Sequence, residues 1–117
     1  MRRKSLYVPE RGDAVWITMD PQAGHEQAGR RPALVLSPSA YNGRVGLALF
    51  CPIRSRVKGY PFDVPLSAGS PVSGVVVADQ IKSLDWRARK AARIGAVSDD
   101  ILLQVVKRIE RLLTESG

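Results

Sequence analysis

Residues 20–36 read DPQAGHEQAGRRPALVL, a charged loop that leads directly into an apolar strand. Gly24 and Gly29 interrupt the loop, and the apolar run that follows begins with Arg31 and Pro32. A proline near the start of a strand removes an N–H where its loss does least harm. The loop itself has too few apolar side chains to contribute to a core, and polar loops between strands often carry function. It is therefore the first candidate for a functional site.

Apolar runs on both sides of this segment predict further short strands. The clearest is the run of three valines after Gly74, because β-branched residues between turn signals favour strands. Trp16 is expected to be a large core residue of the first strand. The expected strands are Asp13–Met19, Arg31–Leu36, Val45–Cys51, Pro61–Leu66, Gly74–Ala78 and Ala91–Val97. Short helical turns are expected at Ser39–Gly43 and around Leu84-Asp85-Trp86.

One long helix is predicted near the C-terminal end. Ser98 is a candidate N-cap, and the two aspartates after it favour the positive end of the helix dipole. Apolar residues then recur at helical spacing from Ile101 to Leu113, with basic residues on a side that is read as a solvated face. Short strands followed by one helix indicate a mainly β or α+β fold, a small antiparallel β-barrel, open or closed, with a C-terminal α-helix.

Composition limits the class of protein. A chain of 117 residues with 44% hydrophobic residues fits a single domain, 1–117, in which 1–6 is expected to be a flexible tail. The net charge of +7 favours a polyanionic partner, which could be nucleic acid, an acidic protein or a membrane surface. A single cysteine excludes an intramolecular disulfide. With no signal-peptide or membrane-spanning pattern, a soluble cytoplasmic protein is expected.

Several kinds of active site are disfavoured. One histidine and one cysteine leave no cluster of metal ligands, and no phosphate-binding glycine pattern follows a strand, so no metal or nucleotide cofactor is expected. No particular serine is tied to His25 as a hydrolytic pair. The remaining residues suit attack by an RNA 2′-hydroxyl on its own phosphodiester. Glu26 or His25 would act as the base, and the Arg31 guanidinium would donate two parallel hydrogen bonds to the phosphate.

Three blocks of the sequence resemble the MazF/PemK family of toxin endoribonucleases. The blocks are GHEQAGRRPALVLSP, KGYPFDV and ADQIKSLDWRAR, and the resemblance runs from about Tyr7 to Leu113. It implies an SH3-like barrel that acts as a homodimer and cleaves single-stranded RNA at short sequences without a metal. The implied products carry a 2′,3′-cyclic phosphate and a 5′-hydroxyl. A small acidic antitoxin of the MazE type is the implied inhibitor, which agrees with the basic charge.

The resemblance also implies roles for individual residues. Glu26 and Arg31 occupy loop positions that the family uses for activity, with Arg31 as the phosphate-contacting acid or base. An exposed aromatic beside a lysine, as in the second block, suits base stacking and neutralisation of the RNA backbone. The residues expected to bind RNA are Gln27, Gly29, Arg30, Arg56, Lys58, Tyr60, Phe62, Asp79 and Gln80.

Structural roles remain open for several of these residues. Arg31 could pair with Glu26 in an exposed ion pair, which would contribute only about 0–1 kcal/mol. Tyr60 and Phe62 could instead pack at the start of a strand. Asp79 could cap the turn that follows it rather than act on RNA.

The sequence departs from the family at one position. After Pro52 the family has an apolar residue and then a threonine whose hydroxyl contacts the scissile phosphate, whereas this chain has Arg54 there, followed by Ser55. Ser55 could supply the hydroxyl, or Arg54 could replace it with a cation, so both join Arg31 and Glu26 as catalytic candidates. Alternatively, the chain is an attenuated variant that binds RNA or antitoxin without cleaving. That last interpretation predicts that Arg54→Thr raises RNA cleavage.

Overall fold

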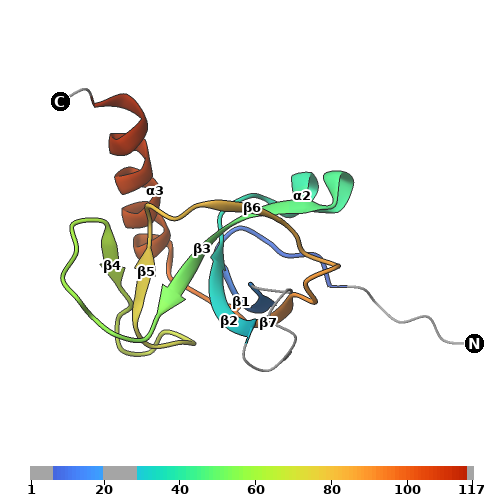
Figure 1. Ribbon diagram of the computed structural model, residues 1–117, viewed down its shortest axis with the longest axis horizontal. Coiled ribbons are helices and arrows are strands. Elements are labelled where there is room, and N and C mark those ends of the chain that lie inside the picture. Colours follow the sequence, from blue (N-terminus) through green and yellow to red (C-terminus); the bar gives the residue numbers. More distant parts are fainter. Residues whose placement is uncertain (1–6, 20–28, 116–117) are drawn as a thin grey trace, which may run out of the picture.

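The computed structural model describes residues 7–19 and 29–115. Its elements are β1 (Asp13–Thr18), β2 (Arg30–Val35), α2 (Ser39–Val45), β3 (Leu47–Arg54), β4 (Asp63–Pro65), β5 (Val75–Val77), β6 (Lys82–Asp85), β7 (Ala92–Ala96) and α3 (Asp99–Thr114) (Figure 1). The strands pair in the order β4-β5-β3-β2-β1-β7, with β6 on β3, and every pairing is antiparallel. Over the described residues this path does not close into a ring. The expected antiparallel β fold with a C-terminal helix is confirmed.

β3 is the strand that connects the two parts of the sheet. Its first half pairs with β6, its middle with β2, and its last two residues, Ile53 and Arg54, with β5. Figure 1 shows α2 near the start of β3, and α3 beside β4 and β5 at the other end of the molecule. The end of β3 therefore delivers Arg54 to the junction between the large ladder and the small β4–β5 hairpin.

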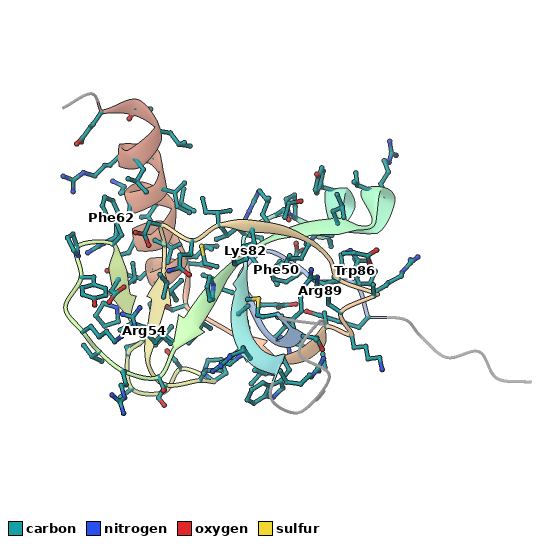
Figure 2. All side chains as sticks on the ribbon, viewed as in Figure 1. Phe50, Arg54, Phe62, Lys82, Trp86 and Arg89 are labelled. Atoms are coloured by element: carbon teal, nitrogen blue, oxygen red, sulfur yellow. The ribbon has the colours of Figure 1, made fainter. Side chains whose placement is uncertain are left out.

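Two hydrophobic clusters cover opposite faces of the sheet. Side chains alternate between the faces of a strand, so Ala14 and Val15 belong to different clusters. The first cluster includes Leu34, Cys51, Val76, Ile101 and Val105, the last two from α3. The second includes Ile17, Val35, Phe50 and Trp86 (Figure 2). Burial on both faces explains why β2 and β5 read as short continuous apolar runs.

α3 begins and packs as its sequence predicts. The Ser98 Oγ accepts a hydrogen bond of 3.2 Å from the backbone N–H of Ile101, and Asp99 and Asp100 lie in the first turn. Ile101 and Val105 are the buried residues of the helix, one turn apart on its inner face. Neither of the helices in the described part of the chain is long and apolar enough to cross a membrane.

Trp16 is not the core residue that the sequence predicts. It is 45% exposed, and its cross-strand neighbours are Pro32 on β2 and Ala92 on β7. The inward positions of β1 on one face are filled by Val15 and Ile17, so Trp16 points to the opposite face. The expectation of a buried tryptophan was therefore wrong.

The helical turn expected around Leu84-Asp85-Trp86 was also wrong. Leu84 and Asp85 belong to strand β6, and they pair with the start of β3. The Asp85 carboxylate accepts hydrogen bonds from the N–H groups of Arg87 and Ala88, at 3.1 and 2.9 Å. The turn that the sequence predicts therefore begins at Asp85, at the end of the strand. The expected turn at Ser39–Gly43 is a longer helix, α2.

Cys51 provides a first testable prediction. It is fully buried, and burial, aided by the Asp79 carboxylate, raises its pKa to about 12. The thiolate is the reactive form, so iodoacetamide at about pH 8 is expected to leave the folded protein unmodified and to label it after denaturation. Mass spectrometry of the intact protein measures this. Rapid labelling of the folded chain would contradict the burial of Cys51.

Candidate functional site

The site predicted from the sequence lies at the edge where β2 begins and β3 ends. In the β2–β3 ladder, Ala33 faces Pro52. Arg31 stands two residues before Ala33 on β2, and Arg54 stands two residues after Pro52 on β3, so both lie just beyond the last pair of this ladder. Arg31 is exposed, whereas Arg54 is only partly exposed. Three of the four catalytic candidates, Arg31, Arg54 and Ser55, therefore follow or precede the last pair of the β2–β3 ladder by two or three residues.

Arg30 and Arg89 form a polar clamp on the described chain segments that precede and follow residues 20–28. Arg30 Nη1 donates hydrogen bonds to the carbonyls of Arg89 and Lys90, at 3.1 and 2.8 Å. Arg89 Nη1 donates to the carbonyls of Thr18 and Met19, at 3.0 and 2.8 Å. Arg30, expected to bind RNA, thus joins the start of β2 to residues 89 and 90. Arg89 joins the same segment to the end of β1, and sequence reasoning missed it although it stands within the WRAR part of the third block.

His25, Glu26 and Gln27 lie outside the described residues, so their predicted roles stay predictions. Gly29, at the end of the loop, is buried, and its carbonyl accepts a 2.8 Å hydrogen bond from the N–H of Met19. Among the described residues, 7–19 and 29–115, no group of three or more His, Cys, Asp or Glu side chains is arranged to hold a metal ion.

Arg54 makes several contacts within its own region. Its Nη2 forms an ion pair with Asp63 Oδ2, and its Nε donates a 3.0 Å hydrogen bond to the carbonyl of Arg56. Its guanidinium carbon lies 5.3 Å from the centroid of the Tyr60 ring. Figure 2 shows the side chain beside the small β4–β5 hairpin. Asp63 was not among the residues predicted from the sequence.

The loop between β3 and β4, residues 55–62, carries most of the exposed candidates. Tyr60 is 56% exposed, and Lys58 Nζ lies 5.9 Å from the centroid of its ring. Ser55 and Arg56 are exposed at the start of the loop. Phe62 is half-buried and packs against the first hydrophobic cluster (Figure 2). The arrangement presents a ring, a hydroxyl and cations to solvent, a combination that suits a single-stranded nucleic acid.

Asp79 and Gln80 follow β5 and are both exposed. The backbone N–H of Gln80 donates to the carbonyl of Val77 at 3.2 Å, which forms a turn at the end of β5. Asp79 follows Ala78, whose carbonyl accepts a 3.8 Å hydrogen bond from Cys51 Sγ on β3, so Asp79 lies at the end of the β3–β5 ladder. Both residues are therefore open to a ligand at that end of the sheet.

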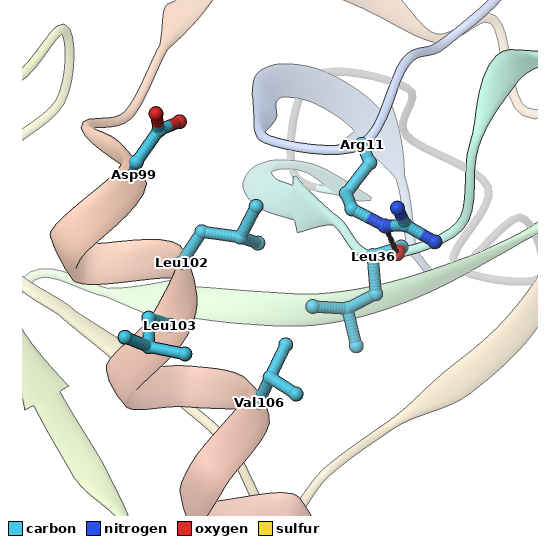
Figure 3. Close-up of a pocket in the computed structure, with 6 residues that line it drawn as sticks. All are labelled: Arg11, Leu36, Asp99, Leu102, Leu103 and Val106. Carbon is cyan, nitrogen blue, oxygen red and sulfur yellow. Dashed lines mark hydrogen bonds between the residues drawn. The ribbon is translucent and has the colours of Figure 1, made fainter.

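A separate groove of about 590 Å³ lies between α3 and the sheet (Figure 3). Arg11 Nε donates a 3.0 Å hydrogen bond to the carbonyl of Leu36 at its rim. The residues that line it are Arg11, Leu36, Asp99, Leu102, Leu103 and Val106. None of the predicted site residues is among them, so the groove is not part of the candidate site.

Comparison with known proteins identifies the same family that the three sequence blocks resemble. The profile of the PemK-like, MazF-like toxin of type II toxin–antitoxin systems matches residues 10–113. Endoribonuclease toxin MazF of Escherichia coli strain K12 is 48% identical over 109 residues, which cover 93% of this chain and 97% of that protein. Endoribonuclease PemK of Escherichia coli is 35% identical over 119 residues, covering 97% and 87% of the two chains.

Solved structures agree with the sequence comparison. A crystal structure of MazF from Deinococcus radiodurans has a TM-score of 0.84 and 55% identity, covering 93% of this chain and 99% of that one. A crystal structure of MazE–MazF from the same organism has a TM-score of 0.85 and 53% identity, with coverage of 94% and 100%. The chain therefore belongs to the PemK-like, MazF-like toxin family of type II toxin–antitoxin systems.

Proposed function

We propose that this protein is the toxin of a type II toxin–antitoxin system and acts as an endoribonuclease on single-stranded mRNA. The observation that carries the proposal is similarity over nearly the whole chain to proteins named endoribonuclease toxins, at 48% identity over 93% of this sequence for one of them. The exposure of Arg31, Lys58 and Tyr60 to solvent supports it. Cleavage would arrest translation and growth.

The chemistry we propose needs no metal. The 2′-hydroxyl of the substrate forms a bond to the adjacent phosphorus, and the bond from phosphorus to the 5′-oxygen breaks. Glu26 accepts the proton of the 2′-hydroxyl, and Arg31 donates a proton to the leaving 5′-oxygen. Arg31 also donates hydrogen bonds to the phosphoryl oxygens, where negative charge grows in the transition state. Ser55 supplies the hydroxyl that the family threonine would supply.

RNA would lie across the edge formed by Arg31 and the 55–62 loop. The Tyr60 ring offers a stacking surface, and Lys58 and Arg56 neutralise phosphates beside it. The other proposed contacts with RNA come from Gln27, Gly29, Arg30, Phe62, Asp79 and Gln80.

Replacement of Tyr60 by alanine is expected to weaken RNA binding without unfolding the protein. Stacking on one aromatic ring contributes about 1–3 kcal/mol, so the Kd should rise by about 5- to 150-fold. Fluorescence anisotropy with a 2′-O-methyl oligonucleotide, which cannot be cleaved, measures the Kd. Tyr41→Ala is the matched control, because Tyr41 is 42% exposed and lies on α2, near the opposite end of β3. Equal affinities of the two variants would contradict the stacking role.

We further propose a homodimer that is inhibited by an acidic antitoxin. The net charge of +7 suits an acidic partner as well as RNA. A solved structure of a relative with 53% identity is described as MazE–MazF, which supports such a partner here. In this proposal residues 1–117 form one domain that works in the cytoplasm, with its mRNA substrate.

Analysis of RNA fragment ends tests the function. A mixed-sequence single-stranded RNA is incubated with the protein in EDTA, and the fragments are sequenced and analysed by mass spectrometry. Discrete fragments with 2′,3′-cyclic phosphate and 5′-hydroxyl ends are expected, and a single 2′-deoxy substitution at the cleavage site should block the reaction. Intact RNA with salt-sensitive binding would instead support a protein that binds RNA without cleaving it. Cleavage that EDTA abolishes would contradict the metal-independent reaction.

A further inference from the structure

The loop of residues 55–62 is enclosed by a contact between its two flanking residues. Arg54 is the last residue of β3, and Asp63 is the first residue of β4. Their side chains form an ion pair, so the guanidinium bridges the base of the loop. The backbone supports the same closure, because the N–H of Asp63 donates a 3.1 Å hydrogen bond to the carbonyl of Tyr60.

The same guanidinium also contacts the interior of the loop. Its Nε donates to the carbonyl of Arg56 at 3.0 Å, near the start of the loop. Its planar face lies 5.3 Å from the centroid of the Tyr60 ring, near the tip. One side chain therefore contacts the start, the tip and the end of the segment. A planar group with five fixed donors is suited to this, whereas a shorter side chain such as threonine cannot reach all three contacts.

Asp63 is a buried carboxylate whose described partner is Arg54. Its side chain is 4% exposed, and the side chain of Arg54 is 23% exposed. Its second oxygen, Oδ1, is buried and makes no hydrogen bond within the described part of the chain. A buried charge that loses its partner is costly, so Arg54 is held at Asp63. A phosphate that displaced Arg54 from Asp63 would leave this carboxylate unpaired.

The backbone of Arg54 is fixed as well as its side chain. Gly74, just before β5, has a φ of +121°, and a Cβ added there would lie 2.2 Å from the carbonyl oxygen of Arg54. Only glycine allows this approach of the two backbones. The guanidinium thus extends from a rigid strand end toward a loop that has few apolar contacts of its own, with Val57 and Tyr60 69% and 56% exposed.

We infer that Arg54 is a positioning residue, which holds the 55–62 loop in the conformation that presents Tyr60 and Lys58 to RNA. The inference rests on the proposed function for its final step, RNA binding. Its first step, the ordering of the loop by the Arg54–Asp63 pair, is independent of any activity. In this role Arg54 neither contacts the scissile phosphate nor inactivates the protein.

Trypsin cleavage of the native protein tests the ordering step. Arg56 and Lys58 are exposed cleavage sites inside the loop, and both remain in the variants Arg54→Thr and Asp63→Asn. Each variant is expected to be cut at these two sites about tenfold faster than the original protein. Arg111→Thr is the matched control, because it removes an equal charge from an exposed ion pair on α3. Unchanged cleavage rates in both loop variants, with folding verified by circular dichroism, would overturn the inference.

Steady-state kinetics on a short RNA tests the functional step. Arg54→Thr is expected to raise KM about tenfold with little change in kcat, and Arg54→Lys to recover part of the loss. Asp63→Asn should resemble Arg54→Thr. Higher activity in Asp63→Asn, or a loss confined to kcat in Arg54→Thr, would identify Arg54 as a phosphate-contacting cation and overturn the inference. Higher cleavage by Arg54→Thr would identify it as an attenuating residue. If the original protein cleaves no RNA, only the proposed function fails, since the trypsin measurement still decides the ordering step.

Discussion

Arg31→Ala is expected to lower kcat for RNA cleavage by about 10²- to 10⁴-fold. This is the usual effect of removing one charge-stabilising donor or one proton-transfer group from an active site. Arg31 lies on β2 opposite Ile17 of β1, and its side chain is exposed. Truncation of an exposed side chain changes stability by only about 0.5 kcal/mol, so the loss should not come from unfolding.

Single-turnover cleavage of a fluorescent RNA separates this effect from substrate binding and product release. Arg31→Lys keeps the charge but loses the planar fork, so an intermediate rate is expected. Arg44→Ala, which removes an exposed arginine from α2, is the control and should cleave at the original rate. If Arg31→Ala retained a rate within about threefold of the original, Arg31 would be a surface residue rather than a catalytic one.

The sequence predicts those features of the fold that depend on local chemistry. The valines of β5 and the Ser98 cap of α3 lie where the pattern places them. Trp16 and β6 were predicted wrongly because both depend on pairing with distant strands. Periodicity alone does not show which face of β1 is covered at Trp16. Nor does it show that Leu84 lies opposite Ala48 on β3.

The candidate site also contains some residues that local sequence patterns reveal and others whose contacts depend on the folding of distant segments. Arg31, Lys58 and Tyr60 stand in recognisable blocks, and the structure leaves all three exposed. The contact between Arg54 and Asp63 was not predicted, although the residues are only nine apart, because it requires the β4–β5 hairpin to fold back beside β3. The clamp of Arg89 on the end of β1 joins residues 70 and 71 positions apart, which no local pattern reveals.

Asn42 is another residue whose importance the sequence did not reveal. It is fully buried in α2, in a segment expected to be little more than a turn. Its Nδ2 donates to the carbonyls of Pro9 and Ser37, both at 2.8 Å, and its Oδ1 accepts from Ser37 Oγ at 2.6 Å. Its backbone carbonyl accepts a 3.0 Å hydrogen bond from the indole N–H of Trp86. One amide therefore joins the N-terminal segment to the end of β2.

Asn42→Ala is expected to destabilise the protein by about 3–5 kcal/mol, because it leaves the buried carbonyl of Pro9 without its partner and removes two bonds to Ser37. The corresponding fall in Tm is about 10–25 °C. Urea unfolding followed by circular dichroism measures the change, and the slope m should stay constant if only stability is altered. Tyr41→Ala, at the exposed neighbouring position, should change the free energy of unfolding by about 0.5 kcal/mol or less. Equal stabilities of the two variants would show that the Asn42 hydrogen bonds are replaced by water, and that α2 is held by apolar contacts alone.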